Sequence, residues 1–295
     1  MTPDNRTAGT AQLRLHFVRA AGGRTVLAQR VVRYPHHITA PLAGRHDAVL
    51  VVQSASGGLY GGEQLQQQVL LGAGAQVELR FPSATVVHAV RQQPAVQQSV
   101  VLQVGEGAAL CHLQRPLILL PGARLVQRLH ASVAPAAHLL WCEGVTLHDP
   151  ASPATQRVAP PPGPTAARSI DSRLTITDAA GRPRVIDRFC IDEAKLSAAV
   201  PGVTGSHRAF GALWWIGGLP NGAWPRWRAA VQALHAADTG LSVAASTLPN
   251  DMGVVIRVAA ADGGGLDAAL QSLLGVVVQD RNAEIAAGRA KRAAA

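Results

Sequence analysis

Apolar and polar residues alternate along much of the chain before residue 150, and this pattern predicts half-buried β-strands. In residues 11–18, for example, apolar residues alternate with Arg14 and His16. Successive side chains of a strand point to opposite faces, so this alternation places the apolar residues on one face. The turn at Gly22-Gly23 and the run 25–33 complete a predicted hairpin.

Runs of the same kind recur at short intervals as far as about residue 148, without an exact sequence repeat and with almost no helical periodicity. Regular strands of this kind predict a mainly β fold with β-helix-like stacked or wound sheets. The predicted strands cover residues 47–53, 64–71, 76–81, 96–104 and 108–113.

Two glycine pairs, Gly57-Gly58 and Gly61-Gly62, lie between two of these strands, and Glu63 follows them. Glycine reaches positive φ without steric cost, so paired glycines mark a backbone path that side chains would forbid. Two interpretations stay open: a long hairpin loop without chemistry, and a constrained loop where the backbone meets a partner or a passing ion.

Glutamines lie on or beside the predicted strands. They can line a polar face without charge, but we expect them to be solvent-facing partners of the alternating apolar residues. They are Gln64, Gln66, Gln67, Gln68, Gln92, Gln93, Gln97 and Gln98.

The second half of the chain begins with residues 150–168, which hold six prolines and predict a surface loop rather than a central strand. Strands resume at 172–177 and 184–191 as a hairpin, and a further pair is expected at 241–246 and 253–259.

Helical spacing appears only in the C-terminal third, where we expect two or so helices. The first covers residues 225–237, and the second begins after the glycines that end at Gly265. We predict one domain over residues 11–288, a disordered segment at 1–10 and a basic frayed tail at 289–295.

The composition is that of a folded protein, because apolar residues make up 48% of the 295 residues and charged residues only 15%. No run is long enough to span a bilayer, and the first ten residues do not resemble a secretory signal. We therefore expect a cytoplasmic protein without a membrane partner. Cys111, Cys142 and Cys190 are widely spaced and odd in number, which favours buried free thiols over disulfides.

The net charge of +9 suits an acidic partner, but the basic residues are spread along the chain and are not interleaved with aromatics. A protein that binds a nucleic-acid groove concentrates its basic residues, so we do not expect nucleic-acid binding.

The motifs that mark common catalytic and metal sites are missing, including Walker-type, GxGxxG, HExxH and GxSxG segments. The histidines do not form i, i+4 helical pairs, so no stable metal site is predicted. Carboxylates are scarce; a β-helical glycosidase would need a well-placed pair, and Glu63 and Glu143 could serve, although the sequence gives no distance between them. A carbohydrate-active enzyme or carbohydrate-binding protein of β-helical or β-sandwich type is therefore the alternative, and a non-enzymatic protein is preferred.

The order of several segments resembles the urease accessory protein family called UreD or UreH. The loop Gly57-Gly-Leu-Tyr-Gly-Gly62 looks like the family's GG-[IL]-x-GG loop. The resemblance extends over roughly residues 12–190. The other similar segments are 23–28, 72–77, 81–85, 120–125 and 173–189.

Departures from the family pattern accompany these matches. Glu63 replaces the family's usual Asp, and Val86-Val-His88 replaces an aromatic-basic sequence. Gln114-Arg115-Pro116 stands where an acidic residue precedes the later turn, and His148-Asp149-Pro150 replaces a GR-x-x-x-GE segment.

The resemblance implies a non-catalytic chaperone for nickel insertion into apo-urease, acting with urease subunits, a helical UreF-like accessory protein and a UreG-like GTPase. It implies nickel in transit through a polar conduit and no stably bound cofactor. By motif match Glu63 and Thr85 are conduit residues, and Glu143 lies near another such region. His88 joins them on chemical grounds, because imidazole suits nickel and His88 lies three residues beyond Thr85.

Overall fold

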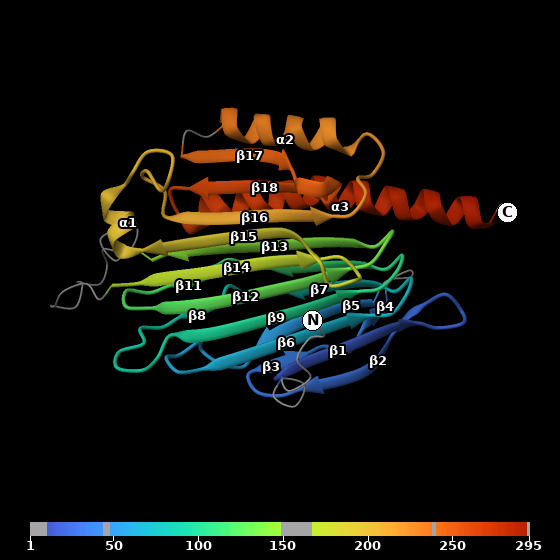
Figure 1. The fold of residues 1–295 in the computed structure, drawn as a ribbon, viewed down its shortest axis with the longest axis horizontal. Helices are drawn as coiled ribbons and strands as arrows, with labels where there is room; N and C mark the ends of the chain where they lie inside the picture. The colour runs from blue at the N-terminus through green and yellow to red at the C-terminus, as the bar shows by residue number, and fades with distance from the viewer. Residues whose placement is uncertain (1–10, 44–47, 149–166, 238–239, 294–295) are drawn as a thin grey trace.

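The computed structural model describes residues 11–43, 48–148, 167–237 and 240–293. The predictions for residues 1–10 and for most of the proline-rich segment 150–168 lie outside these ranges. The described chain forms two facing β-sheets, with two long helices beside the larger one (Figure 1). The predicted mainly β fold is confirmed.

The first sheet has seven strands in the order β15-β14-β12-β9-β6-β1-β2. The predicted first hairpin is present as the antiparallel pair β1–β2, and the hairpin after the proline-rich segment as β14–β15. The strands are β1 (Leu13–Arg19), β2 (Thr25–Val32), β6 (Gln64–Leu71), β9 (Val96–Val104), β12 (Arg124–Val133), β14 (Ser169–Thr177) and β15 (Pro183–Asp192).

The second sheet has eleven strands, with the main order β17-β18-β16-β13-β10-β7-β5-β3 and three short strands, β4, β8 and β11, beside this path. Its strands are β3 (His36–Ile38), β4 (Leu42–Ala43), β5 (Ala48–Ser54), β7 (Gln76–Phe81), β8 (Val86–Val87), β10 (Ala109–Gln114), β11 (Leu117–Leu119), β13 (His138–Leu147), β16 (Ala209–Ile216), β17 (Leu241–Thr247) and β18 (Gly253–Ala260).

The chain winds between the two sheets from β5 to β14. Along the sequence β6, β9, β12 and β14 join the first sheet, while β7, β10 and β13 alternate with them in the second. Neighbours in each set pair in parallel, as expected when the chain returns to the same sheet after crossing to the other. Successive windings of the chain, from one strand of the first sheet to the next, differ in length. The register shows this, since Gln64 pairs with Gln97, Val96 with Leu125 and Arg124 with Ser169. A wound fold therefore exists without a sequence period.

Three helices follow, α1 (Glu193–Ala198), α2 (Ala223–Ala237) and α3 (Gly263–Ala293). α2 and α3 pack on the outer face of the second sheet, where Trp227 and Leu270 are fully buried. α3 begins at Gly263 rather than after Gly265, because the Asp262 carboxylate accepts a hydrogen bond from the Gly265 amide at 2.9 Å. α3 includes residues 289–293 of the predicted tail. α1 was not predicted.

The cysteines are free thiols, and the prediction of burial is confirmed for Cys111 and Cys142 but wrong for Cys190. Cys190 lies on the edge strand β15 and faces solvent, because the alternation of β15 turns Ile191 inward. Within the described residues, no helix is long and apolar enough to cross a membrane.

Candidate functional site

A polar layer crosses the interior between the two sheets. On the first sheet it consists of Gln67, Gln98, Gln127 and Ser172, all at most 8% exposed, and on the second of Gln114 and Glu143. We call these six residues the polar layer. The Gln127 side-chain amide donates a hydrogen bond to Gln98 Oε1 at 2.7 Å. Gln127 also pairs in register with Gln98 on one side and Ser172 on the other.

The polar layer divides the interior into two hydrophobic clusters. On β6, β9, β12 and β14, the inward residue before the polar one belongs to one cluster and the inward residue after it to the other. Replacing both partners of a buried hydrogen bond by apolar groups is often neutral or stabilising, so a continuous polar level between two apolar clusters indicates a use other than stability. The flanking pairs are Leu65 and Val69 around Gln67, Val96 and Val100 around Gln98, Leu125 and Leu129 around Gln127, and Ile170 and Leu174 around Ser172.

Two cavities lie along this layer. The first, of about 460 Å³, is lined by Gln67, Gln98 and Gln114 and reaches Gly57-Gly58 and the exposed His37. The second, of about 360 Å³, is lined by Gln114, Gln127, Ser172 and Glu143 and extends to Asp187 and Arg257. Gln114 and Leu117 belong to the walls of both cavities, so the two cavities are neighbours that share these residues as a common wall.

Glu143 provides the carboxyl group of the layer. Trp214 Nε1 donates a hydrogen bond to Glu143 Oε1 at 3.0 Å. Burial raises the pKa of Glu143, and the hydrogen bond from Trp214 opposes that rise. Arg257 lies over the Trp214 ring, with its Cζ 5.1 Å from the ring centroid, and its Nη2 is 2.7 Å from Asp187 Oδ1.

Two buried histidines lie near the layer. His36 lines the first cavity, and its Nε2 has no hydrogen-bond partner among the described residues. The His112 ring stacks on Trp141, with ring centroids 4.4 Å apart, and is tilted against Phe81, whose ring centroid is 4.6 Å away. Burial lowers the pKa of His36 to about 4 and that of His112 to about 3, so both are neutral at pH 7. No group of three or more His, Cys, Asp or Glu residues that could hold a metal ion occurs in the described part of the chain.

The structure places some of the sequence-predicted residues on these cavities and others away from them. Thr85, Gly57 and Gly58 line the first cavity, and Glu143 lines the second. The described walls of both cavities lack Glu63, His88, Gly61 and Gly62.

Glu63 and His88 instead hold the glycine loop. Glu63 Oε2 accepts a hydrogen bond from the Tyr60 amide at 2.9 Å, which closes the turn at Gly61-Gly62. His88 stacks on Tyr60 with centroids 4.4 Å apart, and its Nε2 lies 3.2 Å from the Gly57 carbonyl oxygen. Their part in a conduit stays a prediction.

The expectation that the glutamines face solvent is wrong for Gln67 and Gln98, which are 5% exposed. Gln64 and Gln97, on the same strands, are exposed as expected. The sequence held a signal for this burial, because residues two positions apart in a strand lie on the same face of the sheet. In Leu65-Gln-Gln67-Gln-Val69, the middle glutamine therefore shares the inward face with Leu65 and Val69.

The fold and this layer define a class of protein, a wound two-sheet β-scaffold with a buried polar layer and two cavities along it. The family model described as "UreD urease accessory protein" matches residues 9–291. The chain therefore belongs to the UreD urease accessory protein family, and it is an accessory protein rather than an enzyme.

Individual relatives agree with this assignment. The chain is 34% identical over 272 residues to urease accessory protein UreD 1 of Methylorubrum extorquens (strain PA1), covering 89% of this chain and 86% of the relative. It is 33% identical over 264 residues to urease accessory protein UreD 1 of Pseudomonas syringae pv. syringae (strain B728a), covering 86% of each. It is 34% identical over 259 residues to the protein of the same name from Bradyrhizobium sp. (strain BTAi1 / ATCC BAA-1182), covering 86% of each.

Proposed function

We propose that this protein is a cytoplasmic scaffold for nickel insertion into apo-urease and that nickel crosses it along the polar layer. It works in complex with urease subunits, a helical UreF-like protein and a UreG-like GTPase. The observation that carries the proposal is the pair of neighbouring cavities that line the polar layer between two apolar clusters and share the wall residues Gln114 and Leu117.

The chemistry of the layer suits an ion in transit. Amide and hydroxyl oxygens are weak, exchangeable ligands for a divalent ion, whereas a closed set of imidazoles and thiolates would trap it. Five of the six layer residues offer only such oxygens. Glu143 adds a carboxyl group whose pKa is raised by burial, so a passing cation favours its ionised form while a proton replaces the cation afterwards.

The decisive variant removes the layer's oxygens while leaving the outer surface intact. Gln98→Leu places an apolar side chain at the layer, and Gln97→Leu makes the same chemical change on the solvent-facing side of the same strand. Each variant is co-expressed with urease subunits and the accessory proteins. We expect Gln98→Leu to lower the nickel content of purified urease at least several-fold while the complex still assembles in a pull-down. Gln97→Leu should leave both quantities unchanged.

Normal nickel content in a Gln98→Leu, Gln127→Leu double variant would contradict the conduit. Loss of the complex in the pull-down would instead mean that the layer supports assembly. Deletion of the gene tests the wider role, because urease made without this protein should lack nickel.

A further inference from the structure

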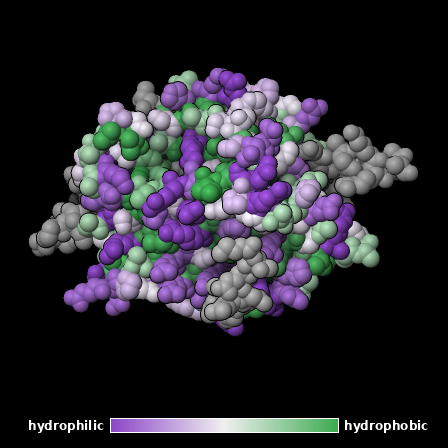
Figure 2. All heavy atoms as spheres, viewed as in Figure 1, coloured by the Kyte–Doolittle hydropathy of each residue, from purple (hydrophilic) through white to green (hydrophobic). Residues whose placement is uncertain are grey.

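The outer face of the seven-stranded sheet carries a row of three arginines. Arg128 on β12 pairs in register with Arg173 on β14, which pairs in turn with Arg188 on β15. All three are exposed, because Leu129 and Leu174, the next residues along β12 and β14, point into the core. Figure 2 shows hydrophilic side chains gathered over the middle of the face on which this sheet lies. We call Arg128, Arg173 and Arg188 the arginine row.

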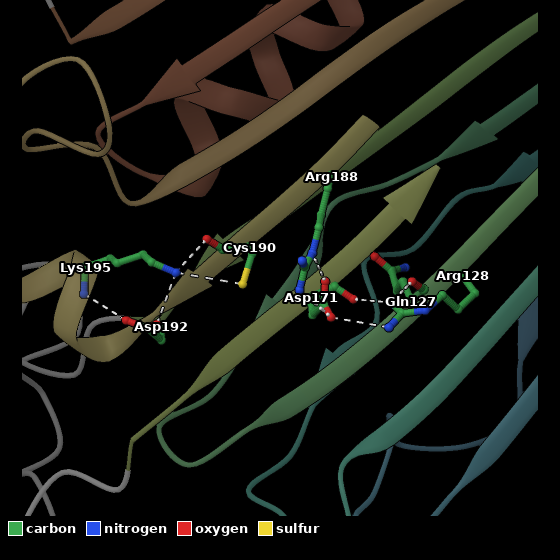
Figure 3. A network of polar contacts seen from close by, with 7 residues as sticks. All are labelled: Gln127, Arg128, Asp171, Arg188, Cys190, Asp192 and Lys195. Atoms are coloured by element: carbon green, nitrogen blue, oxygen red, sulfur yellow. Dashed lines mark hydrogen bonds and ion pairs between the residues drawn. The ribbon is translucent and has the colours of Figure 1, made fainter. Parts of the chain in front are cut away.

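This row is short of negative charge. Like charges directly opposite each other on neighbouring strands destabilise a sheet. Asp171 lies between Arg188 and Arg128, with Oδ1 3.0 Å from Arg188 Nε and Oδ2 3.3 Å from Arg128 Nη2 (Figure 3). Arg173 forms no ion pair within the described residues. One carboxylate therefore pairs with the two outer guanidinium groups, and the central group, Arg173, stays available.

The surroundings of the row fit a protein rather than a nucleic acid. The next outward positions across the sheet are uncharged hydrogen-bonding residues, Ser99 and Gln66. Ile186, the outward neighbour of Arg188 on β15, leaves 55% of its surface exposed. The outward positions of β6, β9, β12, β14 and β15 hold no Phe, Tyr or Trp on which bases would stack.

We propose that this face docks a protein partner through a carboxylate-rich surface, with Arg173 as the central contact and Ile186 as an apolar neighbour. A guanidinium group binds a carboxylate through two parallel hydrogen bonds, and arginine is enriched at protein interfaces. Asp171 pairs with the two outer guanidinium groups, so the partner's carboxylates meet Arg173, unpaired within the described residues, between two oriented arginines. The inference rests on the proposed function in one respect: the partner is sought among the urease subunits, the UreF-like protein and the UreG-like GTPase.

The test measures binding of the purified chain to each of these three partners at low and high salt. Arg173→Glu should weaken binding to at least one partner by about 10-fold or more, and that binding should weaken as salt is added. Arg173→Lys keeps the positive charge but not the planar guanidinium group that forms two parallel hydrogen bonds, so we expect a smaller loss of binding affinity than in Arg173→Glu. Arg228→Glu on α2, an exposed arginine over the other sheet, is the matched control and should bind normally.

Two results would overturn the proposal. One is that Arg173→Glu binds all three partners within about twofold of the unaltered chain. The other is that a single-stranded RNA 20-mer binds the chain and loses affinity in Arg173→Glu while the protein partners do not. Folding is not at risk in this variant, because it removes like-charge repulsion from an exposed position. Nickel content in the Gln98→Leu experiment reports on passage and not on docking, so either proposal can fail alone.

Discussion

Arg257 joins the two sheets at the wall of the second cavity, where its Nη2 lies 2.7 Å from Asp187 Oδ1. Asp187 belongs to the edge strand of the first sheet and Arg257 to β18 of the second. The two charges act on Glu143 in opposite directions, because Asp187 raises the pKa of Glu143 and Arg257 lowers it, each less than burial does.

A pair of variants therefore gives pKa shifts of opposite sign. Arg257→Gln should raise the pKa of Glu143 further, and Asp187→Asn should lower it. Carbon-13 NMR titration of the carboxyl groups measures both. Because Arg257 is half exposed, we expect each change to alter the free energy of unfolding by less than about 1 kcal/mol. Shifts of the same sign in both variants would disprove this electrostatic account.

The glycine loop offers a matched stability test. A Cβ at Gly61 would lie 2.7 Å from Gln93 Cβ and 2.9 Å from Val90 Cα. The Val90 backbone and the base of the Gln93 side chain therefore leave no room for this atom. Gly61→Ala should lower the free energy of unfolding by about 1–3 kcal/mol. A Cβ at Gly57 would meet only the hydroxyl of the exposed Tyr60, which can move, so Gly57→Ala should cost less than about 0.5 kcal/mol. Urea denaturation measures both, and equal costs would contradict the described packing.

Acid should destabilise the protein through its buried histidines. His36 and His112 have pKa values lowered by burial to about 4 and about 3, whereas an unfolded histidine titrates near 6.5. Below pH 6.5 the unfolded chain binds protons that the folded chain does not, so stability falls as the pH falls toward 4. Each such histidine contributes a slope of about 1.4 kcal/mol per pH unit.

His112→Leu should reduce this slope, measured by urea denaturation between pH 6 and pH 4.5. His37→Leu, at an exposed position, is the control that should leave the slope unchanged. If His112→Leu keeps the full slope, His112 is not the buried neutral group described.

The three thiols should react at different rates. Cys190 is exposed, while Cys111 and Cys142 are at most 1% exposed, and burial raises the pKa of Cys142 to about 12. An aromatic disulfide reagent should therefore label one thiol per folded chain and three after unfolding, because only an accessible thiolate attacks it. Cys190→Ser should leave no fast-reacting thiol, and rapid labelling that persists in this variant would contradict the burial of the other two.

The sequence predicted local structure well where one periodicity dominates. The expected strands at 76–81 and 96–104 match β7 and β9, and the helix expected at 225–237 matches most of α2. The sequence did not predict which strands are neighbours in each sheet. Parallel pairs such as β6–β9 join segments that are separated in the chain by strands of the other sheet. A local pattern of apolar and polar residues does not indicate which strand the chain pairs with when it returns to a sheet.

The candidate site was predictable only in part for the same reason. Thr85 and Glu143 line the cavities, yet Gln98 was expected on the surface because glutamine is usually exposed. Its burial depends on the facing sheet, which supplies Gln114 and Glu143. Glu63 shows a local contact that the loop sequence did not predict, because its carboxylate accepts a hydrogen bond from the Tyr60 amide.

The hydrogen-bonded amide pair of Gln98 and Gln127 also has a consequence for the evolution of this sequence. Replacing both by leucine would join two apolar clusters into one, and well-packed apolar groups often match or exceed the stability of a buried polar pair. Selection for thermal resistance alone would thus erase these positions. Stability alone therefore does not account for the presence of this pair in the chain.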